Sequence, residues 1–238
     1  MAVTELYSTS FFNDANLVAY WRLEGNSNDA KNSYNGTDTD ITYGTDYGKF
    51  NQGASFNGST SRVNMASFTR PTAAITVSCW VKTSESENNN VLGGDDSNQG
   101  NAQRSFQLVV TGGKARFLIF NAASLNYMVG DTTVSDGIWH HLVGTYDQAE
   151  VKIYVDGVLD GDAVVLTGAI RSGTGIGFGH LSDEVANDTT NYVGSLDDVA
   201  IFDRCLSDTE ILTLYEGSGV EDLNISLDTD IWGIQIGA

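Results

Sequence analysis

The stretch I138-W-H-H-L-V-G-T-Y-D-Q-A-E-V-K-I-Y-V-D-G-V-L-D-G161 predicts two β-strands and the turn that ends the second. Its second strand, V151-K-I-Y-V155, alternates apolar and polar residues, which is typical of a strand with one face in a core. Asp156-Gly157 follows, and such a pair between apolar runs favours a two-residue hairpin turn with positive φ. His140 and His141 are neighbours on the first strand, so their side chains should point to opposite faces. The pair is therefore expected to be structural, because it cannot ligate one metal ion together.

Short apolar runs of the same kind recur along the chain and predict an all-β fold. In I75-T-V-S-C-W-V81, alternate residues share a face, which indicates one face in the core and one available for other contacts. T111-G-G-K114 favours another hairpin turn, so neighbouring strands are expected to be antiparallel. One short helix is predicted in S207-D-T-E-I-L-T-L-Y215, where Ser207 and Glu210 can form a capping box.

The composition fits one large β domain and excludes some partners. The chain has 238 residues, 41% of them hydrophobic, with 26 glycines and one proline. Its formal net charge of −19 would repel phosphate backbones and anionic headgroups, so no nucleic acid or membrane partner is expected. The acidity favours solubility or a salty habitat over dedicated cation binding. No apolar run is long enough to span a bilayer, and M1-A-V-T-E-L-Y-S-T-S-F-F12 lacks the features of a signal peptide.

Four stretches in succession resemble the laminin G-like domains of the concanavalin A-like lectin and glucanase superfamily. They are L17-V-A-Y-W-R-L-E-G-N-S-N-D29, G53-A-S-F-N-G58 with R62-V63, W139-H-H-L142 with Y154-V-D-G-V-L-D-G161, and G194-S-L-D-D-V-A-I-F-D-R-C-L-S207. The likeness covers residues 17–216 and leaves an N-terminal extension, 1–16, and a C-terminal extension, 217–238. It implies an all-β jelly-roll sandwich of two antiparallel sheets, with one short helix near the C-terminus.

The resemblance also implies a function. Domains of this family are typically non-catalytic and serve adhesion or glycan binding, in some cases with a calcium ion at one rim. We therefore expect a lectin-like or cell-adhesion module that recognises a glycan or a surface protein through rim loops. Its expected location is extracellular, or on a cell or virion surface. Arg22, where a proline is frequent, and Cys205, where an alanine is usual, depart from the family pattern.

Calcium is the metal that the sequence favours, because it takes oxygen ligands from carboxylates, amides and carbonyls. The loop E24-G-N-S-N-D-A-K-N32 is dense in such oxygens. The resemblance places the strand of Asp197 beside the first strand of the domain. The expected ligands are therefore the side chains of Asp29 and Asp197, with Asn26 or Asn28 contributing. The alternative is that these residues only form turns through their own backbones.

A lectin site needs an aromatic platform for sugar rings and polar groups for their hydroxyls. The candidate aromatic residues lie near turns or on the strand face away from the core, and they are Trp80, Tyr127, Tyr154 and Tyr192. The alternative for each is a place in the core, and the sequence does not choose among them. The long polar loops 88–101 and 180–192 are also expected to hold binding function.

No motif points to catalysis, so an enzyme is not expected. Glycosidases need two carboxylates that flank one sugar bond, and the chain has no Glu-x-Asp-x-Glu run. Asp228 and Asp230 have a spacing of two, but they lie in the C-terminal extension without a glutamate partner. Cys79 and Cys205 are too few for a disulfide framework, and two buried thiols are favoured over a single bridge.

The two extensions are too apolar for simple disordered tails, since residues 1–16 include Phe11 and residues 217–238 include Trp232. They are expected either to fold back as extra edge strands or to pair with a neighbouring subunit by strand addition. The second option would make a homo-oligomer. It defines the alternative function, a structural protomer of a surface or virion assembly whose termini mediate subunit contacts.

Overall fold

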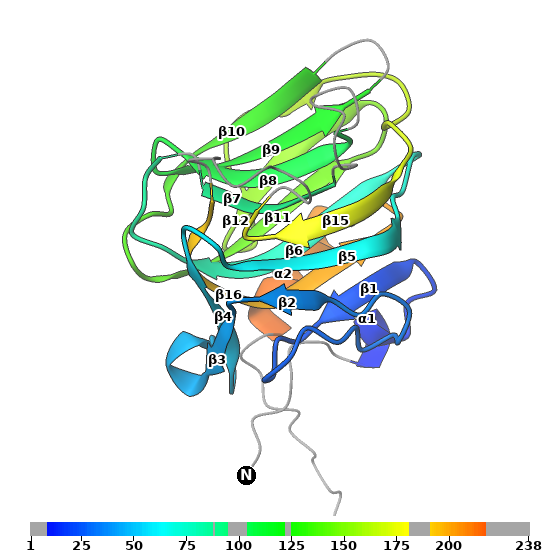
Figure 1. Ribbon diagram of the computed structural model, residues 1–238. Coiled ribbons are helices and arrows are strands. Elements are labelled where there is room, and N and C mark those ends of the chain that lie inside the picture. The colour runs from blue at the N-terminus through cyan, green and yellow to red at the C-terminus, as the bar shows by residue number, and fades with distance from the viewer. Residues whose placement is uncertain (1–8, 88, 95–103, 122–124, 181–190, 218–238) are drawn as a thin grey trace, which may run out of the picture.

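A computed structural model shows a jelly-roll-like sandwich of two antiparallel sheets (Figure 1). It describes residues 9–87, 89–94, 104–121, 125–180 and 191–217. Sheet A has nine strands in the order β13-β12-β11-β6-β16-β4-β3, with β1 paired to β16 and β14 paired to β12. Sheet B has seven strands in the order β10-β9-β8-β7-β15-β5-β2. The predicted fold class is confirmed.

The strands of sheet A are β1 (Leu17–Trp21), β3 (Thr42–Gly44), β4 (Gly53–Asn57), β6 (Ile75–Lys82), β11 (Trp139–Tyr146), β12 (Glu150–Val155), β13 (Val158–Leu159), β14 (Val164–Val165) and β16 (Val193–Phe202). Those of sheet B are β2 (Thr37–Thr39), β5 (Arg62–Thr69), β7 (Asn89–Gly94), β8 (Phe106–Thr111), β9 (Lys114–Phe120), β10 (Leu125–Thr133) and β15 (Thr174–Phe178). The helices are α1 (Thr9–Phe12), a 3-10 turn at Thr45–Tyr47, and α2 (Asp208–Gly217).

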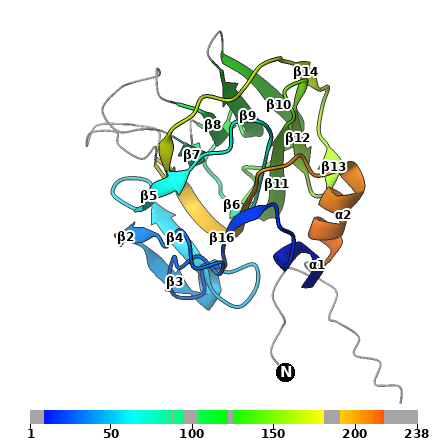
Figure 2. The same ribbon diagram turned by 90° about the vertical axis from the view of Figure 1, so that its right-hand side faces the viewer.

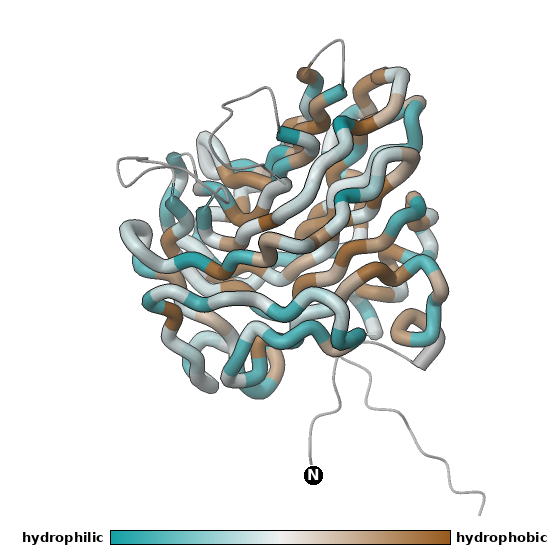
Figure 3. Tube along the Cα trace, turned by 45° about the vertical axis from the view of Figure 1, so that its right-hand side comes forward, coloured by the Kyte–Doolittle hydropathy of each residue, from teal (hydrophilic) through white to brown (hydrophobic). Residues whose placement is uncertain are grey.

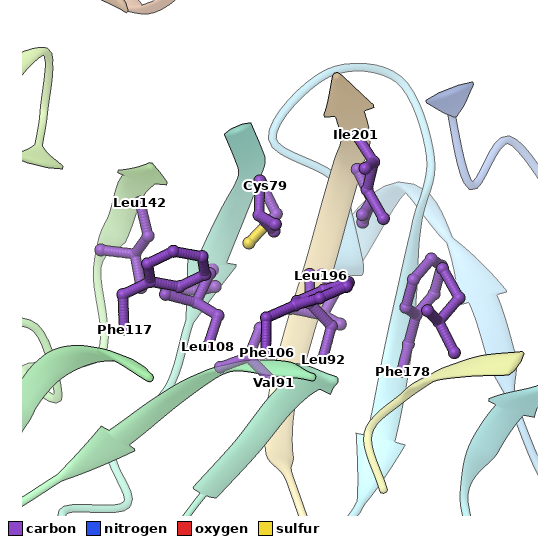
Figure 4. Packing of buried hydrophobic residues seen from close by; sticks show 14 of the residues in the cluster. Cys79, Val91, Leu92, Phe106, Leu108, Phe117, Leu142, Phe178, Leu196 and Ile201 are labelled. Atoms are coloured by element: carbon purple, nitrogen blue, oxygen red, sulfur yellow. The ribbon is translucent and has the colours of Figure 1, made fainter. Parts of the chain in front are cut away.

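Alternate residues of the facing strands fill the space between the sheets. Val77 and Cys79 of β6 are fully buried there, as the alternation predicts. Figure 4 shows Leu108 and Phe117 of sheet B close to Leu142 of sheet A. Apolar segments of the chain gather in the strands, whereas much of the connecting backbone is hydrophilic (Figure 3). The core is therefore one continuous apolar layer that joins both sheets.

The predicted local signals are confirmed. Asp156 and Gly157 have φ of 51° and 82°, and they close the turn between β12 and β13. At the N-terminus of α2, the Ser207 N–H donates to Glu210 Oε2 at 2.8 Å, and the Glu210 N–H donates to Ser207 Oγ at 3.4 Å. These two reciprocal bonds are the capping box that the sequence predicts.

The outer face of sheet A is covered, which corrects the expectation that this face is available. Helices α1 and α2 both lie against it (Figure 2), and Phe11, Ile211 and Leu214 pack with strand residues in one buried cluster. Next to α2, Thr76 Oγ1 of β6 donates to the Arg204 carbonyl at 2.8 Å and accepts from the Leu206 N–H at 2.9 Å. The segment that contains Arg204 and Leu206 is far from Thr76 in the sequence, yet it provides both hydrogen-bond partners of this side chain, which points away from the core.

The described part of the N-terminal extension folds back on its own domain. It does so as a helical turn rather than the predicted strand, and the Phe11 ring lies 6.5 Å from the Phe202 ring. Residues 218–238, with Asp228 and Asp230, lie outside the described residues. Cys79 and Cys205 are both free thiols, although Cys205 is half-buried rather than buried. Within the described residues, no helix is long and apolar enough to cross a membrane.

Gly144 is expected to be required for close packing of the two sheets. A Cβ at this position of β11 would lie 2.3 Å from the Phe117 ring of β9. We predict that Gly144→Ala lowers the free energy of unfolding by about 2 kcal/mol through overpacking. Chemical denaturation checks this, with Gly217→Ala as the control, because a Cβ there meets no atom within 4 Å. The cost should shrink in a Phe117→Leu background, and an unchanged cost would contradict the packing explanation.

Candidate functional site

The two adjacent histidines point to opposite faces of β11, as predicted, and both are buried. His140 lies between two carboxylates: its Nδ1 is 2.8 Å from Asp156 Oδ2, and its Nε2 is 3.2 Å from Asp136 Oδ1. The hydrogen bond to Asp156 raises the pKa of His140, burial opposes the rise, and Asp136 adds to it. His140 therefore joins the turn after β12 to the segment before β11, which is a structural role.

His141 lies on the outer face of sheet A beneath α2. Its Nε2 is 2.8 Å from Ser78 Oγ, and its ring is close to those of Trp80 and Tyr215, at 5.1 and 6.2 Å between centroids. Burial lowers the pKa of His141 to about 4, so the imidazole is neutral near pH 7. Ser78 and His141 are both fully buried, so this Ser–His contact cannot reach a substrate.

Asp29 organises its loop, because both oxygens of its side chain accept hydrogen bonds from backbone N–H groups. Oδ1 accepts from the N–H groups of Tyr20 and Lys31, each at 2.9 Å, and Oδ2 accepts from those of Ser33 and Tyr34, each at 3.0 Å. Four backbone donors thus surround a carboxylate that is 1% exposed. The carboxylate replaces backbone partners that the irregular loop lacks.

Asp197 holds a different loop. Its Oδ2 accepts from the N–H groups of Lys49 and Phe50 at 2.8 and 2.9 Å, and its Oδ1 accepts from the Asp198 N–H at 2.9 Å. Burial, and then the charge of Asp198, raise the pKa of Asp197 to about 9. Backbone donors again occupy both oxygens, and the raised pKa favours the neutral acid near pH 7, so this side chain does not offer a free carboxylate to an ion.

The structure brings three of the predicted calcium ligands, Asn26, Asn28 and Asp29, to the lining of one pocket, but it leaves Asp197 apart from them. β1 pairs with β16 through Trp21 and Val199, and Asp29 bridges to Trp21 at the other edge of β1. β1 therefore lies between Asp29 and the strand of Asp197. Asn26 Oδ1 accepts from the Asn28 N–H at 2.9 Å, which is the turn-forming alternative. In the part of the chain that the structure describes, no three His, Cys, Asp or Glu side chains could share a metal ion.

Three of the four predicted platform aromatics are interior residues. Trp80 is 2% exposed because the Tyr215 ring stacks on it at 5.7 Å and Lys49 Nζ lies 4.2 Å from it. The Tyr154 hydroxyl donates to Asp208 Oδ1 at 2.7 Å, and that of Tyr192 donates to the Ser195 carbonyl at 2.9 Å. Tyr154 and Tyr192 thus find hydrogen-bond partners inside the fold, whereas the buried Nε1 of Trp80 has none among the described residues. Because all three side chains are at most 2% exposed, they do not form an open platform in this structure.

Tyr127 of β10 is 45% exposed, and it lies on the outer face of sheet B. The strand registers place it beside Leu118 of β9, which lies beside Gln107 of β8. Arg116 precedes Leu118 by two residues on β9, so both side chains lie on the same face of the strand. Its guanidinium lies over the Tyr127 ring, 4.6 Å from the centroid, and Arg116 is paired with Val109 of β8. We call this surface the β8–β10 face, and its residues are Gln107, Val109, Arg116, Leu118, Phe120 and Tyr127.

The β8–β10 face has an apolar floor and unsatisfied polar groups. Val109, Leu118 and Phe120 are at most 9% exposed and form a buried cluster separate from the main core. Gln107 is 4% exposed, and its Nε2 has no hydrogen-bond partner. The row through Gln107 continues across Gly93 and Gly177 to Asn64 of β5, whose buried Oδ1 also has no partner. Buried amides without partners cost free energy, so a ligand that displaced what covers these atoms would gain hydrogen bonds to them.

The side chains of this face suit the binding of a ring-shaped polar ligand better than they suit catalysis. Strands β8, β9 and β10 carry one carboxylate, Asp131, which is 83% exposed and 3.9 Å from Lys114. Apolar floor, exposed aromatic ring and amides together are the elements of a small-molecule binding surface. Sequence analysis missed Gln107 and Arg116. The signal was present, because each is a polar residue at an outward position within an apolar strand. Of the two predicted loops, residues 95–101 and 181–190 lie outside the described residues.

Comparisons with known proteins agree with this architecture. A family model described as the concanavalin A-like lectin/glucanases superfamily matches residues 57–212. Domain 4 of AbnA, an extracellular arabinanase from Geobacillus stearothermophilus solved in complex with arabinotriose, is 18% identical with a TM-score of 0.64. That alignment covers 84% of this chain and 98% of the domain. A comparison with curated proteins finds no match.

Toxin binding domains are similar as well. The ligand-binding domain of botulinum neurotoxin serotype D, solved with N-acetylneuraminic acid, is 16% identical over 85% of this chain and 51% of the toxin chain, with a TM-score of 0.65. The binding domain of Paraclostridial Mosquitocidal Protein 1 is 17% identical over 84% and 52%, with a TM-score of 0.66. This chain spans about half the length of those toxin chains. At these identities the likeness shows the fold.

The stability provided by His140 should depend on pH. Because the pKa of His140 is raised in the folded state, its contribution is full below the ordinary pKa and is lost as pH rises through the folded pKa. We predict that His140→Asn costs about 1.5 kcal/mol at pH 5.5 and clearly less at pH 8.5. Denaturation at both pH values checks this, with the exposed turn variant Asp147→Asn as control. An equal cost at both pH values would refute a stabilising contribution from protonated His140 between Asp156 and Asp136.

Asp29 should stabilise the fold without calcium. We predict that Asp29→Asn lowers the free energy of unfolding by about 2 kcal/mol, because two of the backbone donors around the carboxylate would face an amide nitrogen. The same loss is expected in millimolar calcium and in a chelator, as measured by thermal unfolding. The exposed Asp162→Asn serves as control. If calcium raises the Tm of the wild type and Asp29→Asn removes that rise, a calcium site exists and the expectation is wrong.

Proposed function

We propose that this chain, which belongs to the concanavalin A-like lectin/glucanases superfamily, is a non-catalytic module that binds glycans through its β8–β10 face. The carrying observation is the exposed Tyr127 ring with the Arg116 guanidinium over it, beside the buried apolar cluster and the buried, unpartnered amide of Gln107. Sugar rings offer C–H faces to aromatic side chains and hydroxyls to amides, so this surface matches their chemistry.

The known ligands of similar structures support the class of partner. The arabinanase domain, 98% of which is matched, was solved with arabinotriose, and the toxin domain, 51% of which is matched, was solved with N-acetylneuraminic acid. We place the module outside the cell or on a surface, where glycans are displayed. The original expectation of binding through rim loops shifts to a strand face, because the supporting side chains lie on β8, β9 and β10.

Two other functions have weaker support. Hydrolysis of a sugar bond needs two carboxylates on opposite sides of the bond, and Asp131 is alone on the strands of the face. Assembly through the termini, as in a virion protomer, would need apolar side chains available to a neighbour. Phe11 of the N-terminal extension is instead 8% exposed within its own chain. A truncation at residue 217 that abolishes an oligomer would favour the assembly function.

Binding to a glycan array, followed by calorimetry with the best ligand, tests the proposal. We predict that Tyr127→Ala weakens binding by about tenfold or more, as expected for a central aromatic contact. Gln107→Met should also weaken binding while leaving the Tm unchanged or higher, since it removes a buried donor that has no partner. The control is Val158→Ala, a 64% exposed position on sheet A. Normal affinity in both face variants would exclude this face, and a blank array would exclude the function.

A further inference from the structure

We infer that the β8–β10 face selects a sugar that carries a carboxylate, and that Arg116 binds this group. The inference rests on the proposed function and adds the chemical class of the ligand. It starts from the ion pairs of the described residues. Arg204 binds two carboxylates, with its Nη2 2.6 Å from Asp14 Oδ2 and 2.7 Å from Glu210 Oε1. Arg116 has no such partner, although acidic residues outnumber basic ones by 31 to 12 in this chain.

Arg116 is held in place without a polar partner. Its guanidinium lies 4.6 Å from the centroid of the Tyr127 ring, and its buried Nε makes no hydrogen bond. Stacking on an aromatic ring fixes the plane of the group and leaves its Nη donors for an incoming acceptor. A planar guanidinium matches a carboxylate with two parallel hydrogen bonds, which are stronger than bonds between neutral groups.

The surroundings of Arg116 favour an anion at short range. Five of the seven strands of sheet B, β5, β7, β8, β9 and β15, contain no acidic residue, but they contain Arg62, Lys114 and Arg116. The adjacent strand β10 carries Asp131, which pairs with Lys114 at 3.9 Å, and β2 at the far edge carries Asp38. The residues next to Arg116 on the face are apolar, namely Val109 and Val129 in the paired strands. Apolar walls reduce screening by water and strengthen an ion pair that forms there.

The net charge of −19 opposes an anionic ligand only at long range. Salt at physiological strength screens charges beyond about 8 Å, so distant carboxylates contribute little to the bound state. The contacts at Arg116 then decide the preference. The other groups of the face fit the remainder of the same sugar, since Tyr127 is 45% exposed beneath the guanidinium and Gln107 is one row away.

Paired sugars that differ only in the acid test the inference. Calorimetry on the full chain would compare 3′-sialyllactose with its methyl ester, and trigalacturonate with its methyl ester. We expect the acidic member of at least one pair to bind about tenfold more tightly, as a charge-assisted hydrogen-bond pair provides. Arg116→Gln should remove this preference, so that the acidic and the neutral member of each pair bind with equal affinity. Arg116→Lys should keep part of it, because the charge remains but the planar fork is lost.

Lys152→Gln, which removes one positive charge from sheet A, is the matched control and should keep the full preference. Thermal unfolding of each variant verifies that it folds. Equal binding of acidic and neutral sugars would overturn the inference and leave the proposed function standing. A preference that survives Arg116→Gln would also overturn it, because another group would then bind the acid. Absence of binding to any sugar would overturn both the inference and the proposed function.

Discussion

The packing of two sheets across one apolar layer is the constraint on which the rest of this structure depends. Alternate residues of each strand enter that layer, and the sheets come so close that Gly144 has no room for a Cβ against Phe117. Because strand side chains alternate, burial of one set of residues places the other set on an outer face. Formation of the core therefore creates both outer faces. The exposure of each face then decides where a ligand can bind.

On sheet A, the outer face is buried under other segments of the chain. The segment after β16 returns over β6 and β11, and α2 brings Tyr215 onto Trp80. On sheet B, Tyr127 stays exposed and Gln107 keeps an unsatisfied donor. Within the described residues, buried polar atoms without partners occur on both sheets, at Trp80 and Thr145 of sheet A and at Gln107 and Asn64 of sheet B. The two faces differ in exposure, because Trp80 is 2% exposed whereas Tyr127 is 45% exposed. This asymmetry between the sheets locates the candidate site on sheet B.

The fold was predictable from the sequence because its signals are local. Alternation in β6, the Asp156-Gly157 turn and the Ser207–Glu210 capping box each depend on a few neighbouring residues. The site was less predictable, because exposure depends on segments far apart in the chain. Nothing near Trp80 in the sequence indicates that Tyr215 will cover it. The sequence predicts Asp29 as a calcium ligand because oxygen-bearing residues surround it, and the family resemblance adds Asp197. In the structure, backbone N–H groups of irregular loops donate hydrogen bonds to both side chains. The hairpin at 111–114 does fix the register of β8 and β9, so the pairing of Gln107 with Leu118 could have been derived.

Both helical ends of the described domain lie on the same side of the sandwich. Helix α1 and helix α2 share the buried cluster on the outer face of sheet A, with Phe11 and Ile211 among its members. The β8–β10 face lies on the opposite sheet. A bead, a reporter domain or a carrier particle attached at either end would therefore display the face outward. Several copies immobilised in this orientation would present parallel faces to one surface, a geometry that converts weak single contacts into avidity.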